Sequence, residues 1–422
     1  MTLFWISGTA GEGFQVTEAA TTARHNVVAA TSDELRDEVR AWLAEHVPDG
    51  WREQQSGATR DEYIEFQRWW FAEMRSGGYL VPHWPQEHGG GGFSIAEQVV
   101  LHEEVARAGA PRLQLHFASL YHLPATLLHA GSEAQIARHL PAILEGTVWC
   151  QGFSEPDAGS DLASLRTRAK AVDGGYLITG QKLWTSMAEY ADWCMLLART
   201  DPTAPAHHGI SLFLLDMSSP GVELRALRQA SGAAEFCELF LDDVFVPDDC
   251  LVGAVNDGWR IAQSTLSAER GLTMLELTER LRFGFRRLVE QLATDRSAEL
   301  ADSWSRDALG ASYAELEALR HLCGQLVDQL VAHGGVGVEA SVVKVIYSEA
   351  LQRFATLAVE LEGLPAQMSS GLLLGAGWES GHAMQDFINS WMWTIAGGTN
   401  EIQRNVIGER MLGLPREPRV TL

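Results

Sequence analysis

The chain has 422 residues, enough for about three domains at about 150 residues each. Its 46% hydrophobic and 21% charged residues exclude a disordered, collagen-like or coiled-coil protein. The 32 basic and 55 acidic residues give a net charge of −23, which opposes general attraction to nucleic acid or anionic lipid. Five cysteines without a CxxC pair, no long apolar run and no signal-peptide pattern lead us to expect a cytoplasmic protein.

The first domain is expected to be helical and to span residues 31–146. Residues 1–30 are rich in Thr, Ala and Gly without apolar periodicity, which is typical of a flexible extension. A capping box from Thr31 to Glu34 then predicts the start of a helix. Further helical patterns cover residues 60–76, 95–108 and 113–139.

The pattern changes to strands over residues 147–257 and returns to helices over 258–422. Short alternating runs separated by turns predict a compact β-barrel or sandwich, with strands at 148–153, 165–172, 176–184, 193–200, 209–216 and 237–246. Long amphipathic stretches predict a C-terminal four-helix bundle, with helices at 261–295, 308–332, 338–362 and 381–411. The predicted fold class is therefore α+β: a helical domain, a β-barrel domain and a helical bundle.

Three segments carry small and hydroxyl side chains suited to ligand binding. The loop 152–165 places Ser154 and Ser160 after a strand, where backbone N–H groups can approach an anionic or carbonyl-rich ligand. The segment 180–193 sets a tryptophan beside two hydroxyl residues at a strand end, and 395–417 sets two glycines before a helix N-terminus. Each segment alone also fits an ordinary turn, sheet rim or helix cap.

Together these segments, in this order, resemble the acyl-CoA dehydrogenase family. The resemblance covers about residues 32–417 and includes the stretches PHWPQEHGG, GFSEPDAGSD, GQKLWTS, LDDVFVP and AGGTNEIQRN. It implies that FAD lies between barrel and bundle at a subunit interface. It also implies α,β-dehydrogenation of an acyl-CoA thioester to a trans-2-enoyl-CoA, with electrons leaving through an electron-transfer flavoprotein.

The resemblance implies a set of cofactor contacts as well. Trp184, Thr185 and Ser186 stand where the family has a Trp-Ile-Thr segment that packs on the flavin ring, so two of the three residue types differ. The other contacts come from the loop after the first strand and from the C-terminal glycine-threonine loop. The full expected set is Gln151, Phe153, Ser154, Ser160, Trp184, Thr185, Ser186, Thr399 and Glu401.

The implied reaction needs a base that removes the α-proton of the thioester. Many family members carry this glutamate two residues before the loop threonine, where the present chain has Gly397. Other members carry it on the first bundle helix just before an arginine, and Glu269 and Arg270 stand there. We therefore expect Glu269 to be the catalytic base, because burial would raise its pKa toward neutrality. Ser160, Arg270 and Gly397 are the expected substrate contacts, the Gly397 N–H polarising the thioester carbonyl.

Two family motifs are not recognisable in this sequence. The Arg-x-x-Phe-Gly segment is missing from 293–300, where Arg296 is the candidate, and the Gln-x-x-Gly-Gly-x-Gly segment is missing from 370–381. Such losses resemble actinobacterial members that combine two different subunits and act on bulky CoA esters, so a homo-oligomer and a heterotetramer both stay open. A flavin oxidase or monooxygenase, and a non-catalytic subunit, are the alternative functions. The thioester carrier also stays open, and no metal, nucleic-acid or membrane partner is expected.

Overall fold

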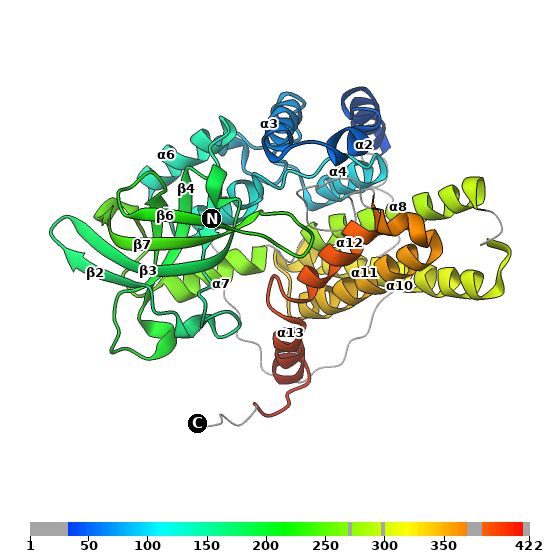
Figure 1. Cartoon of the computed structure of the whole chain (residues 1–422). Helices are drawn as coiled ribbons and strands as arrows, with labels where there is room; N and C mark the ends of the chain where they lie inside the picture. Colours follow the sequence, from blue (N-terminus) through cyan, green and yellow to red (C-terminus); the bar gives the residue numbers. More distant parts are fainter. Residues whose placement is uncertain (1–32, 269–271, 297–299, 369–381, 417–422) are drawn as a thin grey trace.

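The computed structural model describes residues 33–268, 272–296, 300–368 and 382–416. The expected extension 1–30 and the capping box at Thr31 lie outside these ranges. Figure 1 shows the strands gathered on one side of the molecule and the long C-terminal helices on the other, with the N-terminal helices beside both. The predicted order of helical, strand and helical regions is confirmed.

The N-terminal region begins with a helix over residues 33–46. It continues with α2 (Trp51–Ser56), α3 (Arg60–Ser76), α4 (Ile95–Arg107), α5 (Leu123–Ala130) and α6 (Glu133–Leu144). The helical pattern over 113–139 corresponds to several elements, a π-helical turn (Ala118–His122), α5 and α6, and the residues of this stretch before Ala118 are not helical except at Phe117. Gly131 is extended there and Ser132 caps α6 through Gln135, so the chain starts a new helix.

The middle region is an open β-sheet, and the predicted barrel closure is wrong. Its strands are β1 (Trp149–Gly152), β2 (Arg168–Val172), β3 (Gly175–Ser186), β4 (Trp193–Arg199), β5 (Ile210–Asp216), β6 (Val222–Leu227), β7 (Phe236–Pro247) and β8 (Leu251–Val252). They follow the order β6-β7-β3-β2-β4-β5-β8, with β1 paired to β4. The two edge strands, β6 and β8, each pair with one neighbour and not with each other; β8 has only two residues, and β6 exposes Glu223 and Arg225.

A bulge in the long antiparallel pair β3–β7 shapes one end of the sheet. The register shifts between Lys182 and Thr185, and Trp184 between them has φ of +62°. A bulge re-aims the side chains that follow it, and a bulky residue with positive φ is uncommon. The last residues of β3 therefore project differently from the regular alternation along the strand.

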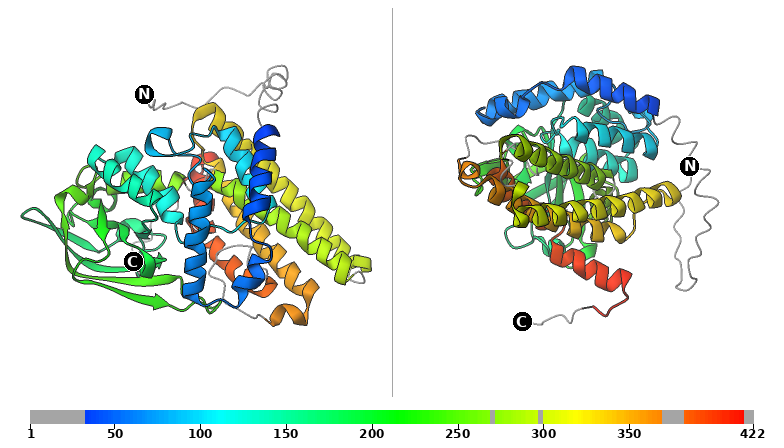
Figure 2. Two further views of the ribbon diagram at one scale, coloured as in Figure 1. Left: turned by 90° about the horizontal axis from the view of Figure 1, so that it is seen from above. Right: turned by 90° about the vertical axis from the view of Figure 1, so that its right-hand side faces the viewer.

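The C-terminal region packs three long helices with shorter ones. Its helices are α7 (Gly258–Ala268), α8 (Leu272–Asp295), α10 (Ser303–His333), α11 (Glu339–Glu362), α12 (Ala383–Ser390) and α13 (Asn400–Val406). The helix predicted over 381–411 is wrong as one element, because Gly397 and Gly398 adopt φ of +66° and +88° and end the helical path. Two views at right angles show α8, α10 and α11 side by side (Figure 2). Within the described ranges, no helix combines the length and apolarity needed to cross a membrane.

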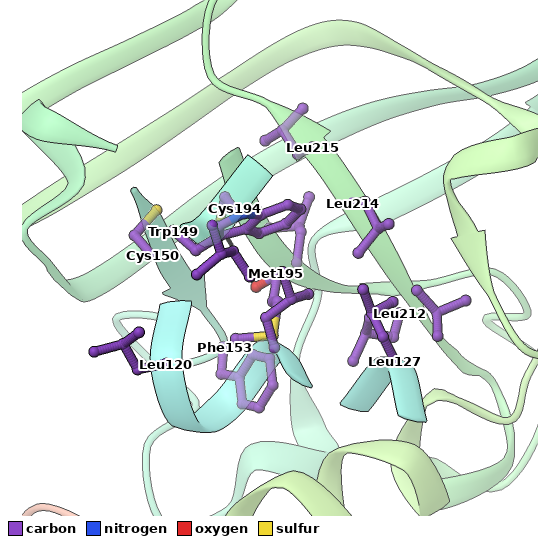
Figure 3. Close-up of a cluster of buried hydrophobic side chains, with 14 of the residues drawn as sticks. Leu120, Leu127, Trp149, Cys150, Phe153, Cys194, Met195, Leu212, Leu214 and Leu215 are labelled. Carbon is purple, nitrogen blue, oxygen red and sulfur yellow. Dashed lines mark hydrogen bonds between the residues drawn. The ribbon is translucent and has the colours of Figure 1, made fainter. Parts of the chain in front are cut away.

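Two large hydrophobic cores hold these regions together. One core joins the sheet to the N-terminal helices, and Figure 3 shows Trp149, Phe153 and Met195 packed within it. The other core lies inside the bundle, among α8, α10 and α11. All five cysteines are free and buried, four in the first core and Cys323 in the second.

Candidate active site

A cavity of about 260 Å³ lies where the three regions meet. Leu101 and Val105 of α4 and Met274 and Leu277 of α8 give it apolar walls. Ser186 at the end of β3 and Gly397 from the C-terminal loop also line it. Two residues for which the resemblance implies cofactor and substrate contacts, more than 200 positions apart, thus line one cavity.

The bulged end of β3 presents an exposed aromatic face beside hydroxyl groups. Trp184 is 56% exposed, and its ring meets Phe236 edge to face at 5.9 Å. The hydroxyl of Thr185 is fully buried and has no hydrogen-bond partner among the described residues, whereas Ser186 is exposed. An exposed indole next to hydroxyl groups suits a flat heteroaromatic ligand.

The loop after β1 is held in place by a buried ion pair. Glu155 accepts hydrogen bonds from Lys182 Nζ at 2.8 Å and from the backbone N–H groups of Arg166 and Thr167. Burial lowers the pKa of Lys182 to about 8, although Glu155 opposes this shift. For Glu155, burial favours a higher pKa, but Lys182 and the hydrogen bonds prevail and lower it. This network fixes the loop from which the sequence predicts cofactor contacts.

The predicted contacts in this loop differ in exposure. Ser160 is exposed, while Gln151 and Ser154 are partly buried and the Ser154 carbonyl accepts a hydrogen bond from Leu183 N at 2.9 Å. Phe153 packs in the core, and its carbonyl accepts a hydrogen bond from Lys182 Nζ at 3.1 Å. The loop and the end of β3 are thus joined directly.

The glycine-threonine loop is held by hydrogen bonds from α13, the helix that follows it. Gln403 of α13 donates through Nε2 to the carbonyls of Gly397 at 3.0 Å and Gly398 at 3.4 Å. The Thr399 hydroxyl caps α13 by accepting from Ile402 N, so it is engaged in the helix start. Glu401 in the first turn is exposed, and hydrogen bonding to its own backbone N–H and to Thr399 lowers its pKa.

A cluster of charged and polar side chains forms another wall of the cavity, which we call the polar wall. It consists of His102, Arg112, Tyr121, Glu276 and Arg280. Glu276 accepts from Arg280 Nε at 2.7 Å and lies 3.5 Å from His102 Nδ1 and 4.0 Å from Arg112 Nε. Burial favours a higher pKa for Glu276, but Arg280, His102 and Arg112 together lower it to about 2.

Sequence reasoning missed the polar wall, although one signal was available. Glu276 and Arg280 are separated by one helical turn on a buried face of α8 that otherwise carries Leu277 and Leu281. Charged residues rarely occupy such a face unless they are paired or functional. A second missed residue is Glu235, which also lines the cavity and whose pKa is raised by burial.

Other predicted residues lie away from this cavity or outside the described ranges. Glu269 and Arg270 are outside them, as are residues 370–381. Arg296 donates through Nη1 to the carbonyls of Leu361 and Glu362, both at 2.6 Å, at the end of α11 of its own chain. In the part of the chain that the structure describes, no group of His, Cys, Asp and Glu side chains is arranged to hold a metal ion.

Comparisons with known proteins agree with this arrangement. Family models for the N-terminal, middle and C-terminal domains of acyl-CoA dehydrogenases match residues 29–147, 150–244 and 256–412. The chain is 37% identical to the acyl-CoA dehydrogenase IpdE1 of Mycolicibacterium smegmatis over 398 residues, covering 91% of this chain and 98% of the relative. It is 43% identical to FadE34 of Mycobacterium tuberculosis over 345 residues, covering 80% of this chain but 45% of that longer protein.

Solved structures give the same relationship. The Tcur3481-Tcur3483 steroid ACAD superposes with a TM-score of 0.80 at 32% identity, covering 92% of this chain and 98% of that one. The ChsE4-ChsE5 complex from Mycobacterium tuberculosis superposes with a TM-score of 0.77 at 30% identity, with the same coverage. The order of the three regions, the shared cavity and these matches lead to one conclusion: the chain belongs to the acyl-CoA dehydrogenase family.

Proposed function

We propose that this chain dehydrogenates an acyl-CoA thioester between its α and β carbons, with FAD as cofactor and Glu269 as the base. The observation that carries the proposal is that Ser186 and Gly397 line one cavity with apolar walls. Ser186 belongs to the segment expected at the flavin ring, and Gly397 to the loop expected at the thioester. A cavity bounded by both has room for an acyl group between them.

The residues present fit a flavin. Trp184 offers an exposed indole face, the Thr185 hydroxyl is buried without a partner in the described ranges, and Ser186 is exposed next to it. Flat aromatic rings with polar edges bind to such combinations of aromatic faces and hydrogen-bonding groups. When bound, FAD would supply the acceptor for the hydride that leaves the β carbon.

The chain's own part of the reaction is to hold the thioester and to remove its α-proton. The N–H of Gly397 can donate to the thioester carbonyl, which makes the α-proton more acidic. The base must be an ionised carboxylate whose pKa is not far below neutrality. Glu276 is a poor base because its arginine neighbours hold its pKa at about 2. We assign the role to Glu269, with Glu235 as the carboxyl group against which the assignment must be tested.

The decisive experiment replaces each carboxylate singly and follows flavin bleaching without oxygen. We expect Glu269→Gln to slow bleaching by a thioester about 100-fold or more, since losing a general base costs about that factor. The matched Glu235→Gln variant should bleach within a fewfold of wild type. Bleaching retained in Glu269→Gln and lost in Glu235→Gln would move the base to Glu235. A flavin that no thioester bleaches, from a panel of straight, branched and steroid acyl-CoA esters, would overturn the dehydrogenase activity.

We also propose that the enzyme works as part of a larger assembly and passes electrons to an electron-transfer flavoprotein. Two related structures carry the names of paired chains, Tcur3481-Tcur3483 and ChsE4-ChsE5. Arg296, the candidate for the arginine that reaches a neighbouring subunit's FAD, instead contacts the end of α11 in its own chain. A second, different subunit could therefore supply what this chain lacks.

A further inference from the structure

We infer that the polar wall recognises an oxygen-bearing group on the acyl part of the substrate, so that the preferred thioester carries a ketone, hydroxyl or carboxylate away from the reacting carbons. This inference rests on the proposed function for the identity of the ligand as an acyl thioester. The polar wall itself is defined by the structure alone: His102, Arg112, Tyr121, Glu276 and Arg280 all line the cavity.

The polar wall is assembled from three parts of the chain. His102 lies on α4, Glu276 and Arg280 on α8, and Arg112 and Tyr121 come from the stretch between α4 and α5. Arg280 also donates through Nη1 to the Ala110 carbonyl at 2.7 Å, which ties α8 to that stretch. Tyr121 stacks on His83 at 5.0 Å with nearly parallel rings, so its phenol is held in a fixed orientation. The groups are therefore positioned before any ligand arrives.

The charge states favour a polar ligand. Glu276 stays ionised, burial lowers the pKa of His102 so that its imidazole is neutral near pH 7, and the two arginines are cationic. Guanidinium groups carry only N–H donors, and a phenol can both donate and accept. A hydrocarbon tail placed against these groups would displace water and offer no hydrogen bond in return, which is costly for buried polar groups.

A second charged cluster on the same helix shows what a purely structural network looks like here. Glu279 and Arg282 on α8 pair with each other at 2.6 Å, and Arg282 and Glu279 reach Glu317 and Arg320 on α10. None of these four residues lines the cavity. The structural cluster joins two helices on one face of α8, whereas the polar wall places its charges along the cavity. This difference in position favours recognition over helix clamping for the polar wall.

The test compares matched ligands on the flavoprotein as isolated. The hydrocarbon ligand is cyclohexylpropanoyl-CoA, and the oxygenated ones carry a ketone, hydroxyl or carboxyl on the ring carbon opposite the side chain. Affinity is measured with the corresponding CoA thioethers, which cannot be dehydrogenated, by isothermal titration. We expect at least one oxygenated ligand to bind about tenfold tighter or more than the hydrocarbon ligand, and the ring substituent that gains most identifies the group recognised.

Variants then assign the preference to the polar wall. Tyr121→Phe removes one hydroxyl, and Arg112→Met removes one guanidinium that lies 4.0 Å from Glu276, so neither empties the cluster. Each variant should lower the ratio of the affinity for the oxygenated ligand to that for the hydrocarbon ligand about threefold or more. Leu277→Met on the apolar wall should change the affinities for the two ligands alike. Equal affinities in wild type, or a ratio unchanged in both variants, would overturn the inference.

The two proposals fail in different ways. If both thioesters bleach the flavin equally and bind equally, the dehydrogenase activity stands and the polar wall has no recognition role. If the oxygenated thioether binds tighter but no thioester bleaches the flavin, the recognition stands and the dehydrogenase activity falls.

Discussion

Glu276 is a carboxylate kept ionised inside a largely apolar cavity. It is buried, and Arg280, His102 and Arg112 lower its pKa to about 2 from an ordinary 4.5 against the opposing effect of burial. Because the folded-state pKa is depressed, this carboxylate contributes stability that is present above about pH 4.5 and is lost as the pH falls toward 2. His102 also makes the folded protein less stable in acid. Burial lowers its pKa, so in acid the unfolded chain takes up a proton at this histidine more readily than the folded one.

Replacing Glu276 by Gln should therefore have an effect that depends on pH. We expect the free energy of unfolding to fall by roughly 3–5 kcal/mol at pH 7, because removing one partner leaves buried arginines without their carboxylate. The difference from wild type should narrow as the pH falls below about 4.5, which urea unfolding at several pH values would measure. The exposed Glu360 provides a control, since Glu360→Gln should change little at any pH. A difference that stays constant down to pH 3 would contradict this account.

At the level of elements, α13 sets the position of the glycine-threonine loop. Gln403 holds the carbonyls of Gly397 and Gly398, and Lys344 of α11 donates through Nζ to Asn400 Oδ1 at 2.8 Å. The loop is thus fixed through the helix that follows it, and its glycines adopt the positive φ angles that other residues rarely adopt.

Replacing Gln403 by Leu should loosen this loop without unfolding the bundle. We expect the KM for the thioester to rise and kcat to fall, with kcat/KM lower by about tenfold, since a displacement of about 1 Å can cost more than that. The melting temperature should fall by only a few degrees. Arg404→Gln on the same helix removes an exposed pair with Glu349 and should leave kcat/KM near wild type. Equal losses of kcat/KM in both variants would mean that activity depends on the helix as a whole and not on the contact between Gln403 and the loop.

Element prediction succeeded where local signals were complete. The helix predicted over 60–76 is confirmed. Its local signals are complete, since Thr59 and Glu62 form a capping box and the apolar spacing runs to Ser76. The strand β6 was missed because its alternating exposed residues include Glu223 and Arg225, which resemble a polar loop. Barrel closure could not be judged from strand patterns, since pairing between edge strands depends on their length and position in space.

The site was only partly predictable for a related reason. Its flavin-facing and loop residues belong to short local motifs, which a resemblance can carry over one at a time. The polar wall joins residues far apart in sequence, and Arg280 reaches a carbonyl 170 positions away at Ala110. Such contacts follow from helix packing, so the sequence could show only that charged residues sit on an apolar face of α8.

On the scale of the whole molecule, apolar side chains lie exposed in the segment before the glycine-threonine loop and in the segment after α13. Trp391 and Ile395 before the loop are 57% and 64% exposed, and Leu412 and Leu414 after α13 are also exposed. Large exposed apolar side chains close together are typical of interfaces between subunits. Trp391 and Ile395 come directly before the loop expected at the cofactor, so we expect assembly and flavin binding to be linked.

Replacing Trp391 and Leu412 by Ser should therefore weaken both subunit assembly and flavin binding. We expect a lower mass in solution by light scattering and a smaller ratio of flavin absorbance to protein absorbance after gel filtration. The matched control is Trp304 on α10, which is 54% exposed and lies at the start of that helix. Trp304→Ser should leave mass and flavin content unchanged. An unchanged mass in the double variant would exclude this surface as an interface.

The buried cysteines have a consequence for how the molecule opens. A thiol reacts only as an exposed thiolate, and burial raises the pKa of Cys250 and Cys323 to about 11. Cys250 belongs to the core between sheet and N-terminal helices, and Cys323 to the core of the bundle. Each core thus contains a cysteine that is unreactive while it is buried and that becomes reactive when the core opens. Labelling of the native cysteines with a thiol reagent would therefore distinguish opening of the bundle core, at Cys323, from opening of the core beneath the sheet, at Cys250.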